Sequence, residues 1–199
     1  MPLSRRRVTS ATALKALAHP VRLALLELLV TEGARTASQA AATLGETPAN
    51  CSWHLRKLAE HGFAREVTGV PGRSRPWRAV TEGLTWGDAE EDPETSAAGE
   101  ALTDVLLERE LQRLRAARAA AAREPAEWRD ATSVNQSHAW LTADEARRLS
   151  AAMVDLFLSW PTERVADPAT RPDGARLVSL VGWLVPSGPM PAEGTPRED

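Results

Sequence analysis

The 199 residues carry a net charge of −3, with 43% hydrophobic and 26% charged side chains, which is typical of a soluble globular protein. No apolar run approaches the roughly 18 residues needed to span a bilayer, and no apolar stretch of the signal-peptide type follows the basic N-terminus. We therefore expect a cytoplasmic protein with no membrane partner. The single cysteine, Cys51, excludes an intramolecular disulfide and any multi-cysteine metal site.

The charge is unevenly distributed along the chain. Residues 1–82 contain 12 basic and 6 acidic side chains, whereas residues 83–199 contain 12 basic and 21 acidic ones. Such asymmetry suggests a polyanion as the partner of the basic part. Residues 1–9, which include Arg5 to Arg7, are expected to form a basic tail that is either solvated or an arm on phosphates.

Four helices and a hairpin are predicted over residues 10–82. Capping residues, prolines at first turns and closing glycines place the helices at 10–18, 20–31, 36–44 and 47–61. A very short strand is expected at 34–36. Residues 63–68 and 76–81 are strand-like and flank the Gly- and Pro-rich stretch 69–75, which predicts a β-hairpin.

The rest of the chain is predicted in four parts. We expect an acidic linker at 83–96, a long helix at 97–124, a small C-terminal α+β domain at 125–186 and a disordered tail at 187–199. Within the third part, residues 131–140 and 175–185 are interpreted as strands. A buried helix is the alternative for 175–185.

The helix between those two segments starts at a capping box, Thr142 with Glu145, and carries an apolar face. Four of the seven tryptophans occur in the C-terminal domain predicted at 125–186: Trp128, Trp140, Trp160 and Trp183. They could line a pocket for a small-molecule effector, or they could fill a small core. The sequence contains no recognisable set of catalytic residues. We therefore expect that the protein is not an enzyme and has no cofactor.

The helix 47–61 has two distinct faces. Cys51, Leu55 and Leu58 follow the spacing i, i+4, i+7 and are predicted to face the domain core. The opposite face carries small polar, aromatic and cationic residues: Ala49, Ser52, Trp53 and Arg56. Such a helix suits the major groove of DNA.

Individual roles follow from side-chain chemistry. Asn50 and Ser52 can hydrogen-bond base edges, and Arg56 suits guanine or a phosphate. Trp53 could pack on a thymine methyl group or on its own domain. Lys57, Arg73 and Arg75 are better placed for phosphates or the minor groove. The predicted DNA-binding residues are Thr47, Ala49, Asn50, Ser52, Trp53, Arg56, Lys57, Arg73 and Arg75.

The residues 17–26, 47–58 and the hairpin 63–80 together resemble the winged helix-turn-helix of the ArsR-type regulators. The resemblance implies a mainly α fold with a small β component, and a homodimeric regulator, in particular a repressor, on a palindromic site in double-stranded DNA. Some ArsR relatives sense metals through paired ligands. The four histidines show no such spacing here, so we expect no metal site.

The long helix places Leu107, Leu111 and Leu114 on one narrow stripe. We interpret the stripe as the dimer seam, with packing on the first helix as the alternative.

Two other functions compete with DNA binding. One is a winged-helix module that contacts protein. The other is an enzyme that uses the winged helix only to dimerise, as some small-molecule methyltransferases do.

Overall fold

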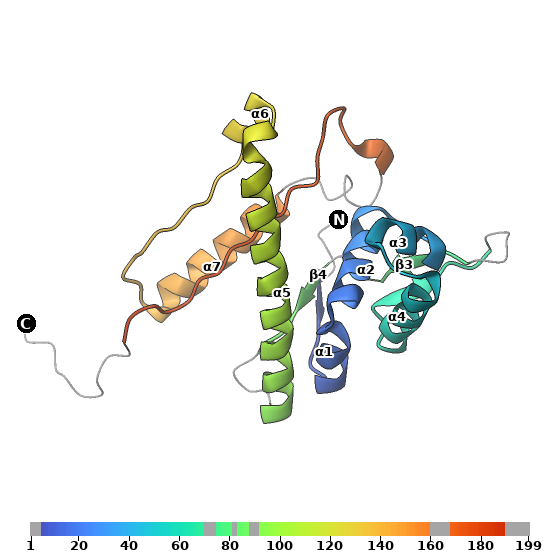
Figure 1. Ribbon diagram of the computed structural model, residues 1–199. Coiled ribbons are helices and arrows are strands. Elements are labelled where there is room, and N and C mark those ends of the chain that lie inside the picture. Colours follow the sequence, from blue (N-terminus) through green and yellow to red (C-terminus); the bar gives the residue numbers. More distant parts are fainter. Residues whose placement is uncertain (1–4, 70–74, 81–82, 88–91, 160–167, 190–199) are drawn as a thin grey trace, which may run out of the picture.

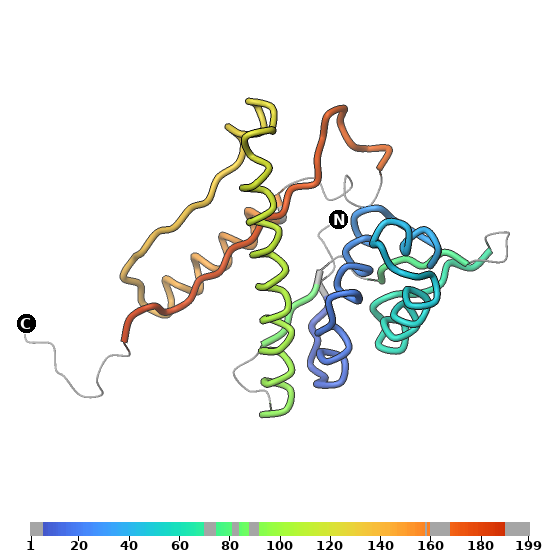
Figure 2. The backbone as a smooth tube through the Cα atoms, viewed as in Figure 1, coloured from blue at the N-terminus to red at the C-terminus, as the bar shows by residue number. Residues whose placement is uncertain are grey.

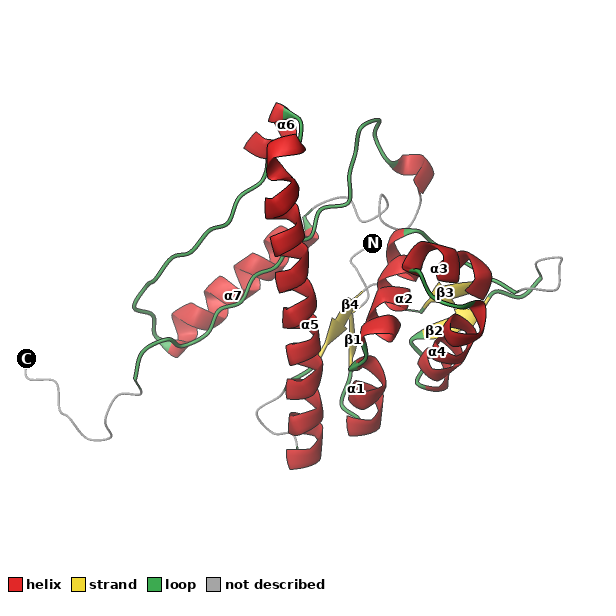
Figure 3. Cartoon of the chain, viewed as in Figure 1, coloured by secondary structure: helices red, strands yellow, loops and turns green. Residues whose placement is uncertain are grey.

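The computed structural model describes residues 5–69, 75–80, 83–87, 92–159 and 168–189. The chain is mainly helical with two small sheets, as predicted (Figures 1 and 3). The elements are β1 (Arg5–Arg7), α1 (Ala11–Leu17), α2 (Pro20–Thr31), α3 (Ala37–Leu44), α4 (Pro48–Glu60), β2 (Ala64–Glu66), β3 (Trp77–Ala79), β4 (Gly83–Thr85), α5 (Pro93–Ala120), η1 (Ala121–Arg123), α6 (Ala126–Asp130), α7 (Ala143–Leu158) and η2 (Pro168–Thr170).

The four N-terminal helices and the hairpin surround one apolar core. Its fully buried large side chains are leucines from α1, α2, α4 and α5 together with Phe63, which follows α4. The antiparallel strands β2 and β3 form the hairpin, and Arg35 makes the expected short bridge with Trp77. The predicted helices 10–18, 20–31, 36–44 and 47–61 are confirmed to within two residues.

Local capping explains where α3 and α4 begin and where α3 ends. Thr36 and Gln39 form a reciprocal capping box at the start of α3. The left-handed Gly45, with φ of 69°, ends α3 at a position where a side chain would be strained. Thr47 then caps α4 through the Asn50 amide, with Pro48 at the first helical position.

The N-terminal arginines are a correction to the expected tail. Arg5–Arg7 form strand β1, which pairs in parallel with β4. The Arg6 guanidinium donates to the Gly62 carbonyl oxygen at 2.8 Å and lies 4.6 Å from the Phe63 ring centroid. This strand could not be predicted from local sequence, because its partner strand is almost eighty residues away.

The acidic linker is also shorter than expected. β4 occupies Gly83–Thr85, and α5 already begins at Pro93, where Asp92 caps the Glu94 and Thr95 amides. Of the expected linker, residues 88–91 lie outside the described ranges. The first turns of α5 pack on α1 through Thr95, Ala98 and Leu102, all of which are buried.

The strands expected at 131–140 and 175–185 are wrong, whereas the helix with the Thr142 capping box is present as α7. Both segments run as extended traces on either side of α7 (Figure 2), without ladder partners among the described residues. Alternating residues at 131–140 and the apolar run at 175–185 favour an extended chain, but a strand also needs a neighbouring strand. Among the described residues no small core forms around the tryptophans, because Trp140 is 99% exposed and Trp183 is 67% exposed. Trp160 lies outside the described ranges.

Candidate nucleic-acid interface

The inner face of α4 fixes the direction in which its outer face points. Cys51, Leu55 and Leu58 are fully buried, as their spacing predicts. Burying a leucine side chain stabilises a fold by roughly 1.5–3 kcal/mol, so rotation of α4 about its axis would be costly. The helix is therefore held with its polar side outward.

The outer face of α4 is available to a ligand. Ala49, Trp53 and Arg56 are exposed, and Ser52 is half-buried beside them. Thr47 is exposed at the start of the helix, although its hydroxyl is used as the cap. Lys57 is half-buried and pairs with Glu60 at 2.8 Å, so its ammonium group is shared with a carboxylate. These positions agree with the predicted outer face.

Asn50 is not a free base-reading group in this structure. Its side-chain nitrogen donates to Glu46 Oε2 at 2.8 Å, and the residue is half-buried. Contact with a base edge would require Asn50 to exchange this partner. Sequence reasoning missed Glu46, although its i, i+4 spacing from Asn50 is a recognised signal for such a pair.

Trp53 lies at the surface and also contacts its own helix. The ring is 47% exposed, and its centroid is 4.7 Å from the ring of His54 in an edge-on arrangement. The Lys57 ammonium lies 5.9 Å from the Trp53 ring centroid. Half of the indole surface thus remains open to solvent at the centre of the outer face.

Beneath the outer face lies a polar pair, the buried His54 of α4 and the half-buried His19 just before α2. Burial, followed by the nearby Arg22, lowers the pKa of His19; burial, followed by His19 and Arg22, lowers that of His54. Glu46 opposes both shifts. Burial also raises the pKa of the Cys51 thiol, which favours its protonated, unreactive form.

The β2–β3 hairpin, called here the wing, contributes a second cationic surface that the sequence interpretation did not single out. In the register of the hairpin, Arg65 of β2 lies directly opposite Arg78 of β3, and both are exposed. Neither guanidinium has an ion-pair partner within the described part of the chain. Like charges directly opposite on a sheet destabilise it, so this pair indicates a polyanionic partner rather than a structural role.

Of the two arginines predicted at the tip of the wing, the structure describes only Arg75. Arg75 is exposed and makes a long contact of 3.4 Å with Glu66 Oε2. Arg73 lies outside the described residues. Arg65 and Arg78 could have been found in the sequence, because each stands next to a buried residue in its strand and therefore points to the opposite, solvent side.

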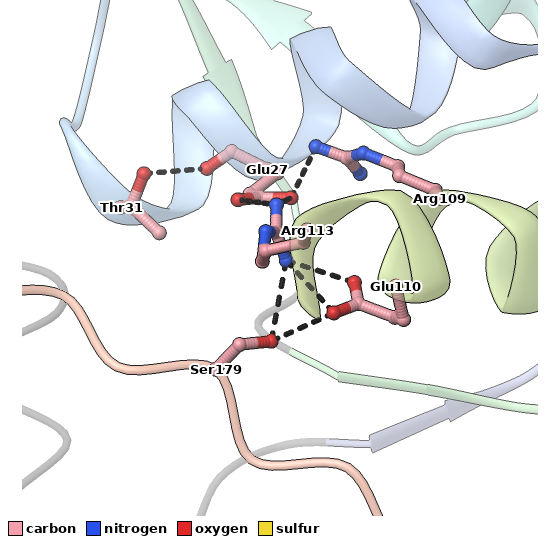
Figure 4. A network of polar contacts seen from close by, with 6 residues as sticks. All are labelled: Glu27, Thr31, Arg109, Glu110, Arg113 and Ser179. Carbon is pink, nitrogen blue, oxygen red and sulfur yellow. Dashed lines mark hydrogen bonds and ion pairs between the residues drawn. The ribbon is translucent and has the colours of Figure 1, made fainter. Parts of the chain in front are cut away.

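The predicted seam leucines are all partly open to solvent. Leu107, Leu111 and Leu114 are 45%, 41% and 38% exposed. On the other side of α5, Arg109 and Arg113 both pair with Glu27 of α2 (Figure 4). The alternative, packing on the first helix, applies to the first turns of α5 and not to these leucines.

Figure 4 also shows how this side of α5 meets the C-terminal part of the chain. Arg113 bonds Glu110 on its own helix at 2.8 Å, and Ser179 donates to Glu110 Oε2 at 2.8 Å. An open pocket of about 280 Å³ lies near this network between α2, α3 and α5. Its lining includes Glu27, Arg35 and Arg109, and none of the C-terminal tryptophans lines it.

Two searches of the described residues bear on other kinds of site. No group of three or more His, Cys, Asp or Glu side chains comes together there as metal ligands would. In the same residues, no helix combines the length and hydrophobicity that crossing a bilayer requires.

Comparison with known proteins supports the architecture of the N-terminal part. Residues 17–67 match a family model described as a helix-turn-helix domain, so this part of the chain is a helix-turn-helix. No curated protein matches the sequence.

Three of the similar solved structures are of ZitR from Lactococcus lactis, each 14% identical to this chain. A double mutant covers 70% of this chain and 75% of its own, with a TM-score of 0.31. The same mutant in its apo form covers 70% and 83%, with a TM-score of 0.33. Wild-type ZitR in complex with DNA covers 72% and 74%, with a TM-score of 0.29.

Proposed function

We propose that this protein is a homodimeric transcriptional regulator of the ArsR type, acting as a repressor on a palindromic site in duplex DNA. The observation that carries the proposal is the pair of directly opposed arginines on the β2–β3 hairpin, Arg65 and Arg78, beside the exposed face of α4; the described residues supply neither with an ion-pair partner. A fold without a polyanionic partner gains nothing from placing two cations opposite each other.

The outer face of α4 and the wing have different roles in binding. The α4 face, with Ser52, Trp53 and Arg56, enters the major groove and reads base edges. The wing arginines contact phosphates, which fixes the position of the helix but carries no sequence information. Asn50 also reads a base once its hydrogen bond to Glu46 is broken.

Two-fold symmetry is supported by the surface that α5 leaves open. Leu107, Leu111 and Leu114 lie within about 60° on the helical wheel, and Arg109 lies on roughly the opposite side, toward α2. These three side chains are between 38% and 45% exposed, and a second copy of the chain would cover them.

The test is binding of the full chain to duplex DNA selected from random fragments, measured at several salt concentrations. We expect a two-fold-related consensus and an affinity that falls steeply with salt, because each phosphate contact releases a counterion. Arg148, an exposed arginine of α7 away from these surfaces, provides the matched control: Arg148→Ala should bind as wild type. Selection that returns no consensus, or an affinity that ignores salt, would exclude the proposal in favour of a protein-binding winged helix.

A further inference from the structure

The segment 175–185, called here the apolar arm, is held in place along its length. Arg176 pairs with Glu124 just after η1 at 2.6 Å, and Ser179 bonds Glu110 of α5. Further along, Gly182 lies on α7: a Cβ atom there would be 2.8 Å from Met153 Cε. The arm is therefore positioned against both α5 and α7.

Although it is positioned, the arm hides little of its apolar surface. Its large apolar side chains are between 38% and 67% exposed: Leu177, Val178, Leu180, Val181, Trp183, Leu184 and Val185. Within the described ranges, the backbone N–H and C=O groups of 176–185 have no hydrogen-bond partner. Seven neighbouring apolar side chains on an unpaired extended backbone are a template for another chain.

The arm also adjoins the leucine stripe. Glu110, which accepts the Ser179 hydroxyl, lies roughly 65° around α5 from the middle of the stripe. Glu110 and Arg113 bracket Leu111 in the sequence, so the arm passes α5 at the level of the central leucine. The arm thus crosses α5 beside the leucine stripe, and the polar pair Glu110 and Arg113 holds it there.

We propose that the apolar arm is the second half of the homodimer interface and packs on the arm and stripe of a second copy of this chain. The inference rests on the proposed homodimer and adds a surface to it. In a two-fold dimer each contact is made by the same patch of both chains. An axis near Leu111 therefore brings the two arms together, where their open backbones can pair.

Area favours a second copy over a small or transient partner. Obligate homodimers bury about 2,000–5,000 Å² in total, and three leucines per chain cannot supply this alone. With the arm, ten large apolar side chains per chain become available: three on the stripe and seven on the arm.

The test compares two valines that are both exposed, Val181 in the arm and Val134 in the segment between α6 and α7. The dimer dissociation constant of full-length Val181→Asp and Val134→Asp is measured by sedimentation over a concentration series. Val181→Asp should raise this constant at least about tenfold, because a charge is buried in an apolar contact. Val134→Asp should not change it, and both variants should keep wild-type affinity for a DNA half-site.

A second measurement does not depend on tolerating a charge. Val181→Cys should form an intermolecular disulfide on mild oxidation, whereas Val134→Cys should not; Cys51 does not interfere because it is fully buried. An unchanged dissociation constant for Val181→Asp, or no cross-link at position 181, overturns the arm interface while leaving the regulator intact. A wild-type chain that stays monomeric, or that fails to bind DNA, overturns the proposed function instead.

Discussion

The imidazole rings of His19 and His54 stack with their centroids 4.6 Å apart and their planes tilted by 40°. His19 Nδ1 accepts the Val21 amide and so caps α2. His54 is only 4% exposed, and its Nδ1 atom has no hydrogen-bond partner in the described part of the chain. The pair therefore connects the start of α2 directly to the inner side of α4, and no ion pair to either ring is present among the described residues.

The first prediction is that acid weakens the helix-turn-helix through this pair. Burial lowers both histidine pKa values from 6.5, so the unfolded state binds more protons than the folded state at mildly acidic pH. The contribution is complete above pH 6.5 and is lost as pH falls below that value. Urea unfolding at pH 8, 6.5 and 5.5 should show a decreasing free energy of unfolding.

Two variants identify the source of that pH dependence. His54→Gln should flatten the profile between pH 8 and 5.5, whereas His138→Gln, at an exposed position, should retain it. Equal slopes for His54→Gln and wild type would show that other groups cause the loss.

The second prediction separates stability from binding at the wing. Arg65→Ala removes one of two opposed charges, so the free energy of unfolding should rise by about 0.2–1 kcal/mol. DNA affinity should fall for all sequences alike, and the salt slope should flatten by about one unit per lost phosphate contact. Arg78→Ala should behave in the same way. If either variant lost stability and kept its DNA affinity, the arginine pair would be structural.

The third prediction concerns Glu46, which holds Asn50. Glu46→Gln keeps an acceptor for the Asn50 amide and removes a negative charge near the expected phosphates. Affinity at low salt should rise about threefold or more, because repulsion of the DNA is reduced. Glu100→Gln, an exposed carboxylate on α5, is the control and should have no effect. Unchanged affinity for Glu46→Gln would place Glu46 outside the interface.

The fourth prediction tests whether Asn50 reads a base. Asn50→Ala should alter sequence preference at one position of each half-site, by about 1–3 kcal/mol. The readout is selection of bound sites by the variant and by wild type in parallel. A uniform loss across all sequences would instead assign Asn50 to positioning or to folding.

The fifth prediction concerns the stripe. Leu111→Glu places two like charges together at the proposed two-fold axis, where ionised groups are costly to bury. We expect a monomer that loses most affinity for the full palindrome and keeps weak binding to a half-site. Sedimentation and binding titrations measure the two effects. A dimer of unchanged stability would place the interface away from α5.

Features set by neighbouring residues could be derived from the sequence. Thr36 with Gln39, and Thr47 with Pro48, define helix starts because a cap acts within one turn. The spacing of Cys51, Leu55 and Leu58 predicted the buried face of α4, because residues at i, i+4 and i+7 lie on the same side of a helix with 3.6 residues per turn. The exposed face followed from the same period.

Features that join distant residues required the tertiary structure. The register of the hairpin put Arg65 opposite Arg78, and the packing of α4 on α2 brought His54 to His19. β1 formed because β4 lay beside it, whereas the alternating segment 131–140 and the apolar segment 175–185 pair with no strand among the described residues. Sequence periodicity fixes which way side chains point along one element. Only the folded chain decides which elements lie side by side, because hydrogen bonds of a sheet and burial of an ionisable group both depend on a neighbour that the local sequence does not contain.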